Sequence, residues 1–119
     1  MALTSSEYAP DGKLLACIEK VGAMPRDGRV GAFSFGKGYG IWLGIMSAMA
    51  VPYTEIPPQR WQGPMLAGLP RGPQSKVSAV HRARSLYPRL PIKVKADWGM
   101  ADAALIAGYA HRVWAKGAA

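Results

Sequence analysis

A chain of 119 residues, of which 50% are apolar and 18% charged, can form one folded domain and is too apolar to be intrinsically disordered. Its single cysteine, Cys17, excludes an internal disulfide and is typical of a reducing compartment. The formal net charge of +8 favours a polyanionic partner, of which nucleic acid is the commonest.

The positive charge is concentrated in the second half of the chain. Residues 1–59 hold five basic and five acidic side chains, whereas residues 60–119 hold ten basic side chains and only two acids, Asp97 and Asp102. A one-sided basic surface indicates nucleic-acid binding. A solvated basic face that keeps the protein soluble would give the same distribution, so charge alone leaves both interpretations open.

The first elements predict an α/β domain over residues 14–119, preceded by a flexible lead-in over residues 1–13. LLACIEKV (residues 14–21) predicts a central parallel strand, because both of its alternating faces are apolar until Glu19. A loop over residues 22–29 contains Pro25 and an Asp-Gly pair.

A long helix is predicted over residues 30–50. Glycines at positions 36, 40 and 44 form a smooth ridge, which indicates either tight packing on the sheet or a seam between two helices. The uncharged run of residues 38–54 is shorter than a membrane span and breaks at Pro52, so we expect no membrane helix. The predicted buried stripe of the helix repeats at three-to-four spacing and consists of Ala32, Phe35, Tyr39, Trp42, Met46 and Met49.

The remaining pattern predicts a short second strand over residues 51–57, a helical turn near Trp61, and helices over residues 74–86 and 98–114. Alternation of strands and helices is typical of α/β folds. Two strands are few, because sheets usually have four to six.

Three acids occupy positions that suggest more than an ordinary solvent-exposed role. Asp102 lies within the apolar surface of the last helix, where a carboxylate needs an ion pair, a hydrogen bond or a metal. Asp97 can cap that helix or act in catalysis. Glu19 projects from the carboxyl end of the central strand, the edge at which α/β sheets bind ligands, unless the strand simply ends there in solvent.

Glu19 and Asp102 could share a hard divalent cation. Mg²⁺ takes oxygen ligands and commonly sits between one or two carboxylates and a substrate phosphate. In a basic domain this combination favours phosphodiester cleavage over other chemistry. His81 and His111 are too few and too scattered for a zinc site.

Four segments together resemble the RuvC-type Holliday junction resolvases, nearest to the branch found in phages and plant chloroplasts. The resemblance covers about residues 14–112 and consists of ACIEKVGAMP, FSFGKGYGIWLGIMSAMAVPYTEIPPQRW, SKVSAVHRARSLYP and DWGMADAALIAGYAHR.

This resemblance implies a ribonuclease-H-like fold and cleavage of four-way DNA junctions by a homodimer with Mg²⁺ or Mn²⁺. By motif match, Glu19, Asp102 and the preceding Asp97 are the metal ligands, and Lys76 lies near the scissile phosphate. The helix over residues 30–50 matches the element that forms the dimer seam. DNA-backbone contacts are expected from Arg71, Lys76, Arg82, Arg84, Lys93 and Lys95.

One departure concerns the start of the family pattern. Members begin with a strand reading roughly GIDPG, whose Asp is an essential ligand, and neither Glu7 nor Asp11 follows an apolar strand here. The chain therefore resembles a member without its first third, with an unpaired edge on the strand of Glu19 that invites pairing between chains.

Three accounts of this departure stay open: a late start of the sequence, a reduced junction binder that does not cleave, or a site completed by another chain. A third function, a structural protein whose basic face meets an acidic protein, is also compatible with the charge. We expect a phage or bacterial cytoplasmic location, with an organelle as the alternative.

Overall fold

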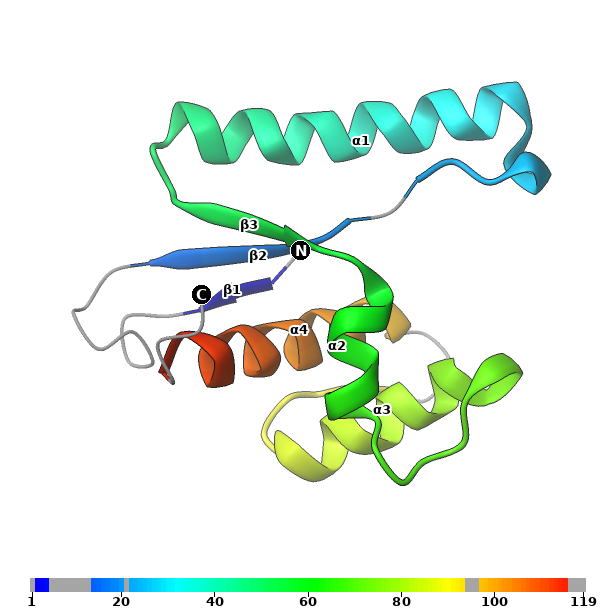
Figure 1. The fold of residues 1–119 in the computed structure, drawn as a ribbon, viewed down its shortest axis with the longest axis vertical. Coiled ribbons are helices and arrows are strands. Elements are labelled where there is room, and N and C mark those ends of the chain that lie inside the picture. The colour runs from blue at the N-terminus through cyan, green and yellow to red at the C-terminus, as the bar shows by residue number, and fades with distance from the viewer. Residues whose placement is uncertain (1, 5–13, 21, 94–96, 116–119) are drawn as a thin grey trace.

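The computed structural model describes the chain except for residues 1, 5–13, 21, 94–96 and 116–119. The elements are β1 (Ala2–Thr4), β2 (Leu15–Glu19), the 3-10 turn η1 (Pro25–Asp27), α1 (Gly28–Ala48), β3 (Tyr53–Ile56), α2 (Pro58–Met65), the 3-10 turn η2 (Gly72–Gln74), α3 (Ser75–Leu86) and α4 (Trp98–Ala115). The described elements are helices and a sheet whose strands β2 and β3 run parallel across the long helix α1, which confirms the predicted α/β class (Figure 1).

The described strands form one sheet in the order β1-β2-β3. The parallel pair β2 and β3 runs in register from Ala16 opposite Tyr53 to Glu19 opposite Ile56. β1 pairs antiparallel with the first part of β2. The predicted flexible lead-in is therefore wrong for Ala2–Thr4, which form a strand. Sequence periodicity did not reveal this strand, because three residues are too few to show a repeating pattern. β1 also covers part of the edge that we expected to be unpaired.

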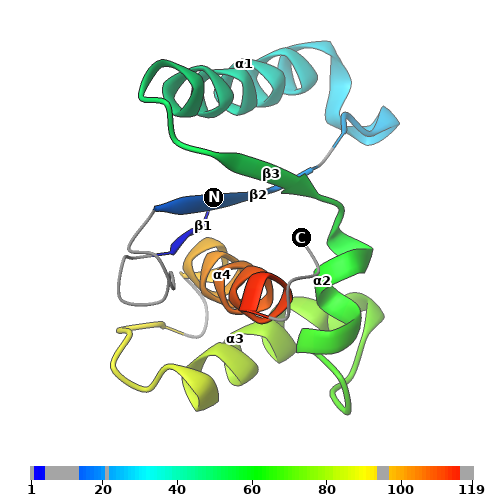
Figure 2. The ribbon, with the colours of Figure 1, turned by 60° about the vertical axis from the view of Figure 1, so that its left-hand side comes forward.

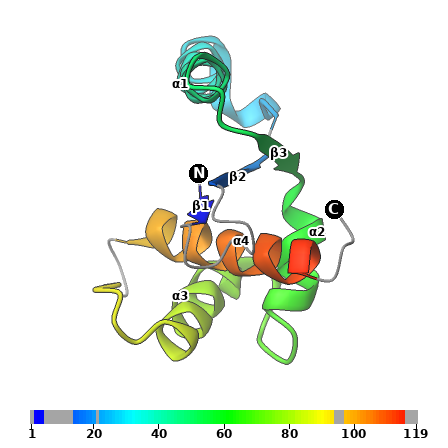
Figure 3. The same cartoon turned by 90° about the vertical axis from the view of Figure 1, so that its left-hand side faces the viewer.

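The central strand is buried on both faces, as its apolar run predicts. Ala16 and Ile18 pack with Met46 beneath α1, whereas Cys17 belongs to the larger core formed with α2, α3 and α4. Figures 2 and 3 show the two layers, with α1 on one side of the sheet and the other helices on the opposite side. Burial raises the pKa of the Cys17 thiol to about 11, which fits a core residue and not a nucleophile.

α1 is far more exposed than its periodicity predicts. Within the predicted stripe only Met46 is buried, while Phe35 is 48%, Trp42 46% and Met49 69% exposed. The described sheet is narrow, so α1 has a small surface to cover and much of its apolar side faces outward. Among the described residues, no helix has both the length and the apolarity needed to cross a membrane.

The large core fixes the geometry of the helices around the pocket described below. α2 begins at Pro58, a residue that favours the first turn of a helix, and this places Trp61 in the core with an exposure of 1%. Leu105 of α4 and Val80 of α3 are equally buried in the same cluster. Trp61 and the neighbouring helices are therefore held by one continuous set of apolar contacts, which also includes Cys17 of β2.

Candidate active site

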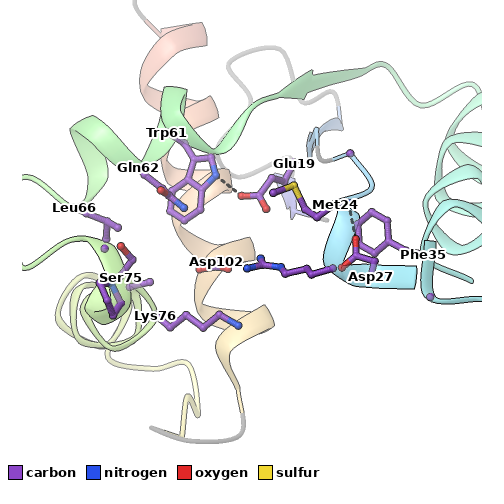
Figure 4. A pocket seen from close by; sticks show the side chains of 16 residues that line it. Glu19, Met24, Asp27, Phe35, Trp61, Gln62, Leu66, Ser75, Lys76 and Asp102 are labelled. Carbon is purple, nitrogen blue, oxygen red and sulfur yellow. Dashed lines mark hydrogen bonds between the residues drawn. The ribbon is translucent and has the colours of Figure 1, made fainter. Parts of the chain in front are cut away.

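A cavity of about 760 Å³ opens at the carboxyl end of β2, between the start of α1 and the helices of the opposite layer (Figure 4). This is the edge of a parallel sheet at which α/β proteins bind ligands. The lining residues with side chains of chemical interest are Glu19, Arg26, Asp27, Trp61, Gln62, Ser75, Lys76 and Asp102.

Glu19 is the last residue of β2, and its side chain reaches the cavity because the strand ends there. The indole Nε1 of Trp61 donates a hydrogen bond of 2.6 Å to Oε2 of Glu19. The strand-end position predicted from the sequence is confirmed, and the side chain does not point into free solvent. It is partly buried and held by a neighbour from α2.

Asp102 lies in the second turn of α4 and enters the same cavity from the opposite layer. Its neighbours Ala101 and Leu105 are fully buried, and Asp102 itself is partly buried. This burial, followed by the negative charge of Glu19, raises the pKa of Asp102 to about 6, against an opposing effect of Lys76. Glu19 thus disfavours the ionisation of Asp102, and both side chains line one cavity.

Lys76 is the second residue of α3 and also lines the cavity. Its Nζ atom lies 4.6 Å from the centroid of the Trp98 ring, a cation–π contact with the first residue of α4. Figure 4 shows Lys76 and Asp102 entering the cavity from neighbouring helices. An exposed ammonium group beside two carboxylates is suited to meet a phosphate bound there.

Asp97 is not brought together with the other two acids. Its Oδ2 accepts the backbone N–H of Lys93 at 2.8 Å, and its carbonyl oxygen accepts the N–H of Ala101, so it stabilises the start of α4. Asp97 precedes the first residue of α4, and unlike Asp102 it is not among the residues that line the cavity. The structure therefore favours the helix-start role over the metal-ligand role for Asp97.

The predicted DNA-contacting residues fall into different environments. Arg71 and Arg84 are exposed, and Arg71 reaches Gln62 beside the cavity. Arg82 is partly buried and donates to the carbonyl oxygen of Ala67 at 2.6 Å, so it anchors the loop between α2 and α3 and is a poor candidate for phosphate contact. Lys93 is exposed, and Lys95 lies outside the described residues.

Two residues of the cavity escaped sequence reasoning. Trp61 looks like an ordinary core residue in the sequence, and only its position in the first turn after Pro58 indicates that it faces the sheet edge. Arg26 belongs to the loop that follows Glu19, and loops after the carboxyl ends of strands commonly contact ligands. Asp27 accepts the backbone N–H of Met24 and shapes that loop.

The donor set fits one hard divalent cation. Within the described part of the chain, no group of three His, Cys, Asp or Glu side chains gathers as a metal site. Mg²⁺, however, usually retains several waters and needs only one or two carboxylates together with substrate phosphate. Glu19 and Asp102 meet that requirement, and a cation between them would relieve the repulsion seen in the raised pKa of Asp102.

The fold and this cavity define a small α/β domain with two acids and a lysine at the end of its central parallel strand. No protein-family model matches the chain. The chain is 34% identical over 99 residues to the protein named Holliday junction resolvase MOC1, chloroplastic, of Chlamydomonas reinhardtii. The matched region covers 82% of this chain and 11% of that relative, so the chain spans about a tenth of the relative's length. This similarity supports the resolvase resemblance found in the motifs.

Proposed function

We propose that this chain is a RuvC-type endonuclease domain with a ribonuclease-H-like fold that hydrolyses phosphodiesters in four-way DNA junctions. The observation that carries the proposal is the meeting of Glu19, Asp102 and Lys76, from three separate elements, in one cavity at the sheet edge. The similarity to a protein named as a junction resolvase supports branched DNA as the substrate.

The proposed cofactor is Mg²⁺, or Mn²⁺ in its place, held by Glu19 and Asp102. When bound, the cation neutralises charge on the scissile phosphate and activates the attacking water. Asp102 must be ionised to act as a ligand, and its pKa of about 6 means that it is ionised at neutral pH even before a cation adds its own stabilisation.

The remaining roles fall to the basic residues around the cavity. Lys76 would stabilise negative charge on the phosphate at the reacting centre. Exposed Arg71, Arg84 and Lys93, together with Lys95, would contact the DNA backbone, and their binding would weaken steeply with salt. We leave Arg82 out of this set because its guanidinium already supports a loop.

A homodimer formed through α1 is the proposed assembly. Seven large apolar side chains of α1 or its immediate C-terminus are exposed, more than a monomer usually leaves in contact with water. A Cβ atom built on Gly36, Gly40 or Gly44 would meet no heavy atom within 4 Å, so these glycines are not used for packing on the sheet. Both observations support the helix-seam interpretation. The exposed apolar residues are Val30, Phe33, Phe35, Ile41, Trp42, Ile45 and Met49.

The second candidate is a structure-selective DNA-binding protein that does not cleave. Three acids line the cavity, Glu19, Asp27 and Asp102, but in the described part of the chain no three such side chains gather as a metal site. This favours the second candidate, because the family resemblance implies a further acid on a strand beside β2. In the described residues that position is taken by Ala2–Thr4, which contains no acid.

Incubation with a labelled four-way junction separates the two candidates. The nuclease proposal predicts strand cleavage in Mg²⁺, none in EDTA, and little cleavage of a linear duplex of the same sequence. Binding to the junction without any cleavage in Mg²⁺ or Mn²⁺ supports the second candidate. Binding to neither DNA would leave the structural-partner interpretation.

For location, the name of the relative places that protein in the chloroplast, which supports the organellar alternative. A phage or bacterial cytoplasmic location stays a prediction, and the position of a tagged chain expressed in its own cell would test it.

A further inference from the structure

We propose that Trp61 is a positioning residue for Glu19, and that its indole N–H holds one carboxylate oxygen so that the other is presented to a divalent cation. The proposal rests on the proposed function of the cavity as a metal-dependent site. Its starting point is the hydrogen bond of 2.6 Å from Nε1 of Trp61 to Oε2 of Glu19, drawn as a dashed line in Figure 4.

Trp61 is a rigid support for such a contact. Its side chain is 1% exposed and packs in the same core cluster as Met65, Leu66 and Leu105. A ring packed in this way has one accessible rotamer, because rotation would displace its neighbours. The N–H group therefore points in a fixed direction from the first turn of α2 toward the end of β2.

Glu19, by contrast, is a flexible side chain at the last position of a strand. It is only partly buried, and among the described residues no hydrogen bond other than that from Trp61 holds its carboxylate. An N–H bond to a carboxylate is charge-assisted and stronger than a neutral one. With Oε2 engaged, Oε1 is the oxygen available on the side of the cavity, which favours a single-oxygen contact to a cation.

A buried tryptophan needs a hydrogen-bond acceptor in any protein, and a backbone carbonyl would satisfy that need. The acceptor here is an acid that lines a cavity and faces a second acid, Asp102. Neighbours that orient metal ligands by hydrogen bonds are general in metal sites, and their removal typically costs 10- to 100-fold in metal affinity. Trp61 has the geometry of such a neighbour.

The test compares Trp61→Phe with Trp114→Phe in the full chain. Both changes replace an indole by a phenyl ring, and both side chains pack against the same core, but Trp114 lines a different cavity at the other end of α4. The measurement is Mn²⁺ affinity by isothermal titration calorimetry, with thermal unfolding in parallel. We expect Trp61→Phe to bind Mn²⁺ at least about 10-fold more weakly than wild type, and Trp114→Phe to bind as wild type does.

A second variant separates the N–H group from the shape of the ring. Replacement of Trp61 by benzothienylalanine, in which sulfur stands where the N–H was, keeps the volume and the packing. The proposal predicts the same loss of Mn²⁺ affinity with little change in melting temperature. Wild-type affinity in this variant would overturn the proposal, including in the case that Trp61→Phe does not fold.

The results also distinguish failure of the proposed role of Trp61 from failure of the proposed nuclease function. If wild type binds Mn²⁺ and cleaves junctions while both Trp61 variants bind Mn²⁺ equally well, only the role of Trp61 is overturned. If wild type binds no Mn²⁺, the proposed metal site is overturned and the role of Trp61 with it.

Discussion

Asp102 in α4 and Glu19 at the end of β2 face one cavity, and the pKa of Asp102 is raised to about 6 by burial and by the charge of Glu19. The two residues are far apart in the sequence, and one ends the central strand whereas the other lies on a helix that covers one face of the sheet. A structural carboxylate in such a place would normally gain a partner that favours its ionised form. Here Lys76 favours that form, but its effect is outweighed by burial and Glu19.

The raised pKa predicts a pH-dependent cost in stability. The folded state binds the Asp102 proton more tightly than the unfolded state, whose pKa is near 3.8, so the penalty is absent below about pH 4 and complete above about pH 6. Asp102→Asn should therefore increase the free energy of unfolding at pH 8 by about 1 kcal/mol, allowing for solvent screening of a half-buried group. At pH 4 the change should be close to zero.

Urea unfolding of wild type and Asp102→Asn at the two pH values measures this difference. A metal-free buffer with EDTA is required, because a bound cation would reverse the sign by favouring the ionised carboxylate. A stability change that is the same at pH 4 and pH 8 would contradict the electrostatic account of Asp102.

Lys76→Met should raise the pKa of Asp102 further, because the ammonium group of Lys76 lowers it in the native protein. The same variant should reduce the salt dependence of DNA binding by about one counterion. Carbon-detected NMR of the Asp102 carboxyl group measures its pKa. Binding to a junction at several salt concentrations measures the salt dependence of DNA binding. Lys37→Met on α1 is the control, since it makes the same change away from the cavity, and an equal effect in both variants would argue against the role of Lys76.

Arg82 and Arg84 make a matched pair on α3 whose substitution should affect different properties, stability for Arg82 and DNA binding for Arg84. Arg82→Gln should lower the free energy of unfolding by about 1 to 3 kcal/mol, because the guanidinium of Arg82 bonds to the carbonyl oxygen of Ala67. Arg84→Gln should leave stability unchanged and weaken DNA binding, because Arg84 is exposed. Chemical denaturation and a filter-binding assay check the two outcomes, and a stable Arg82→Gln protein with weakened DNA binding would reverse the assignment.

Gly40→Leu tests the proposed dimer through α1. A Cβ atom built on Gly40 meets no heavy atom within 4 Å in the chain itself. The folded monomer should therefore tolerate a side chain there, and its helix should gain intrinsic stability. At a helix seam the added side chain would hold the two backbones apart. Light scattering should show wild type as a dimer at micromolar concentration and Gly40→Leu as a monomer, whereas a monomeric wild type would contradict the proposal.

The sequence predicted the described central elements well because their burial is nearly complete. The two-sided apolar run before Glu19 and the helix with Asp102 in its apolar surface follow from packing on a single core, which sequence periodicity reports directly. The same reasoning failed for α1. Its apolar period predicts burial, but a period cannot show whether the covering surface belongs to the same chain or to another one.

The site was predicted only in part, for a related reason. Sequence indicates that a carboxylate is in an unusual place, but the partner that it meets depends on three-dimensional contacts. For Asp97 the sequence left a helix-start role and a catalytic role open, and the hydrogen bond from Lys93 together with its absence from the cavity lining favours the first. Trp61 carried no chemical signal at all, because a core tryptophan and one that donates a hydrogen bond to an acid in a cavity have the same local sequence pattern.

The most direct test of the central claim is the rate of four-way junction cleavage in Mg²⁺ by Asp102→Asn and Asp97→Asn, measured beside wild type. Each change removes one negative charge near the start of α4, so the two variants are matched in chemistry. The account predicts cleavage by wild type, a loss of about 100-fold or more in Asp102→Asn, and a rate within a few fold of wild type in Asp97→Asn. Equal cleavage by wild type and Asp102→Asn, or no cleavage by wild type, would contradict it.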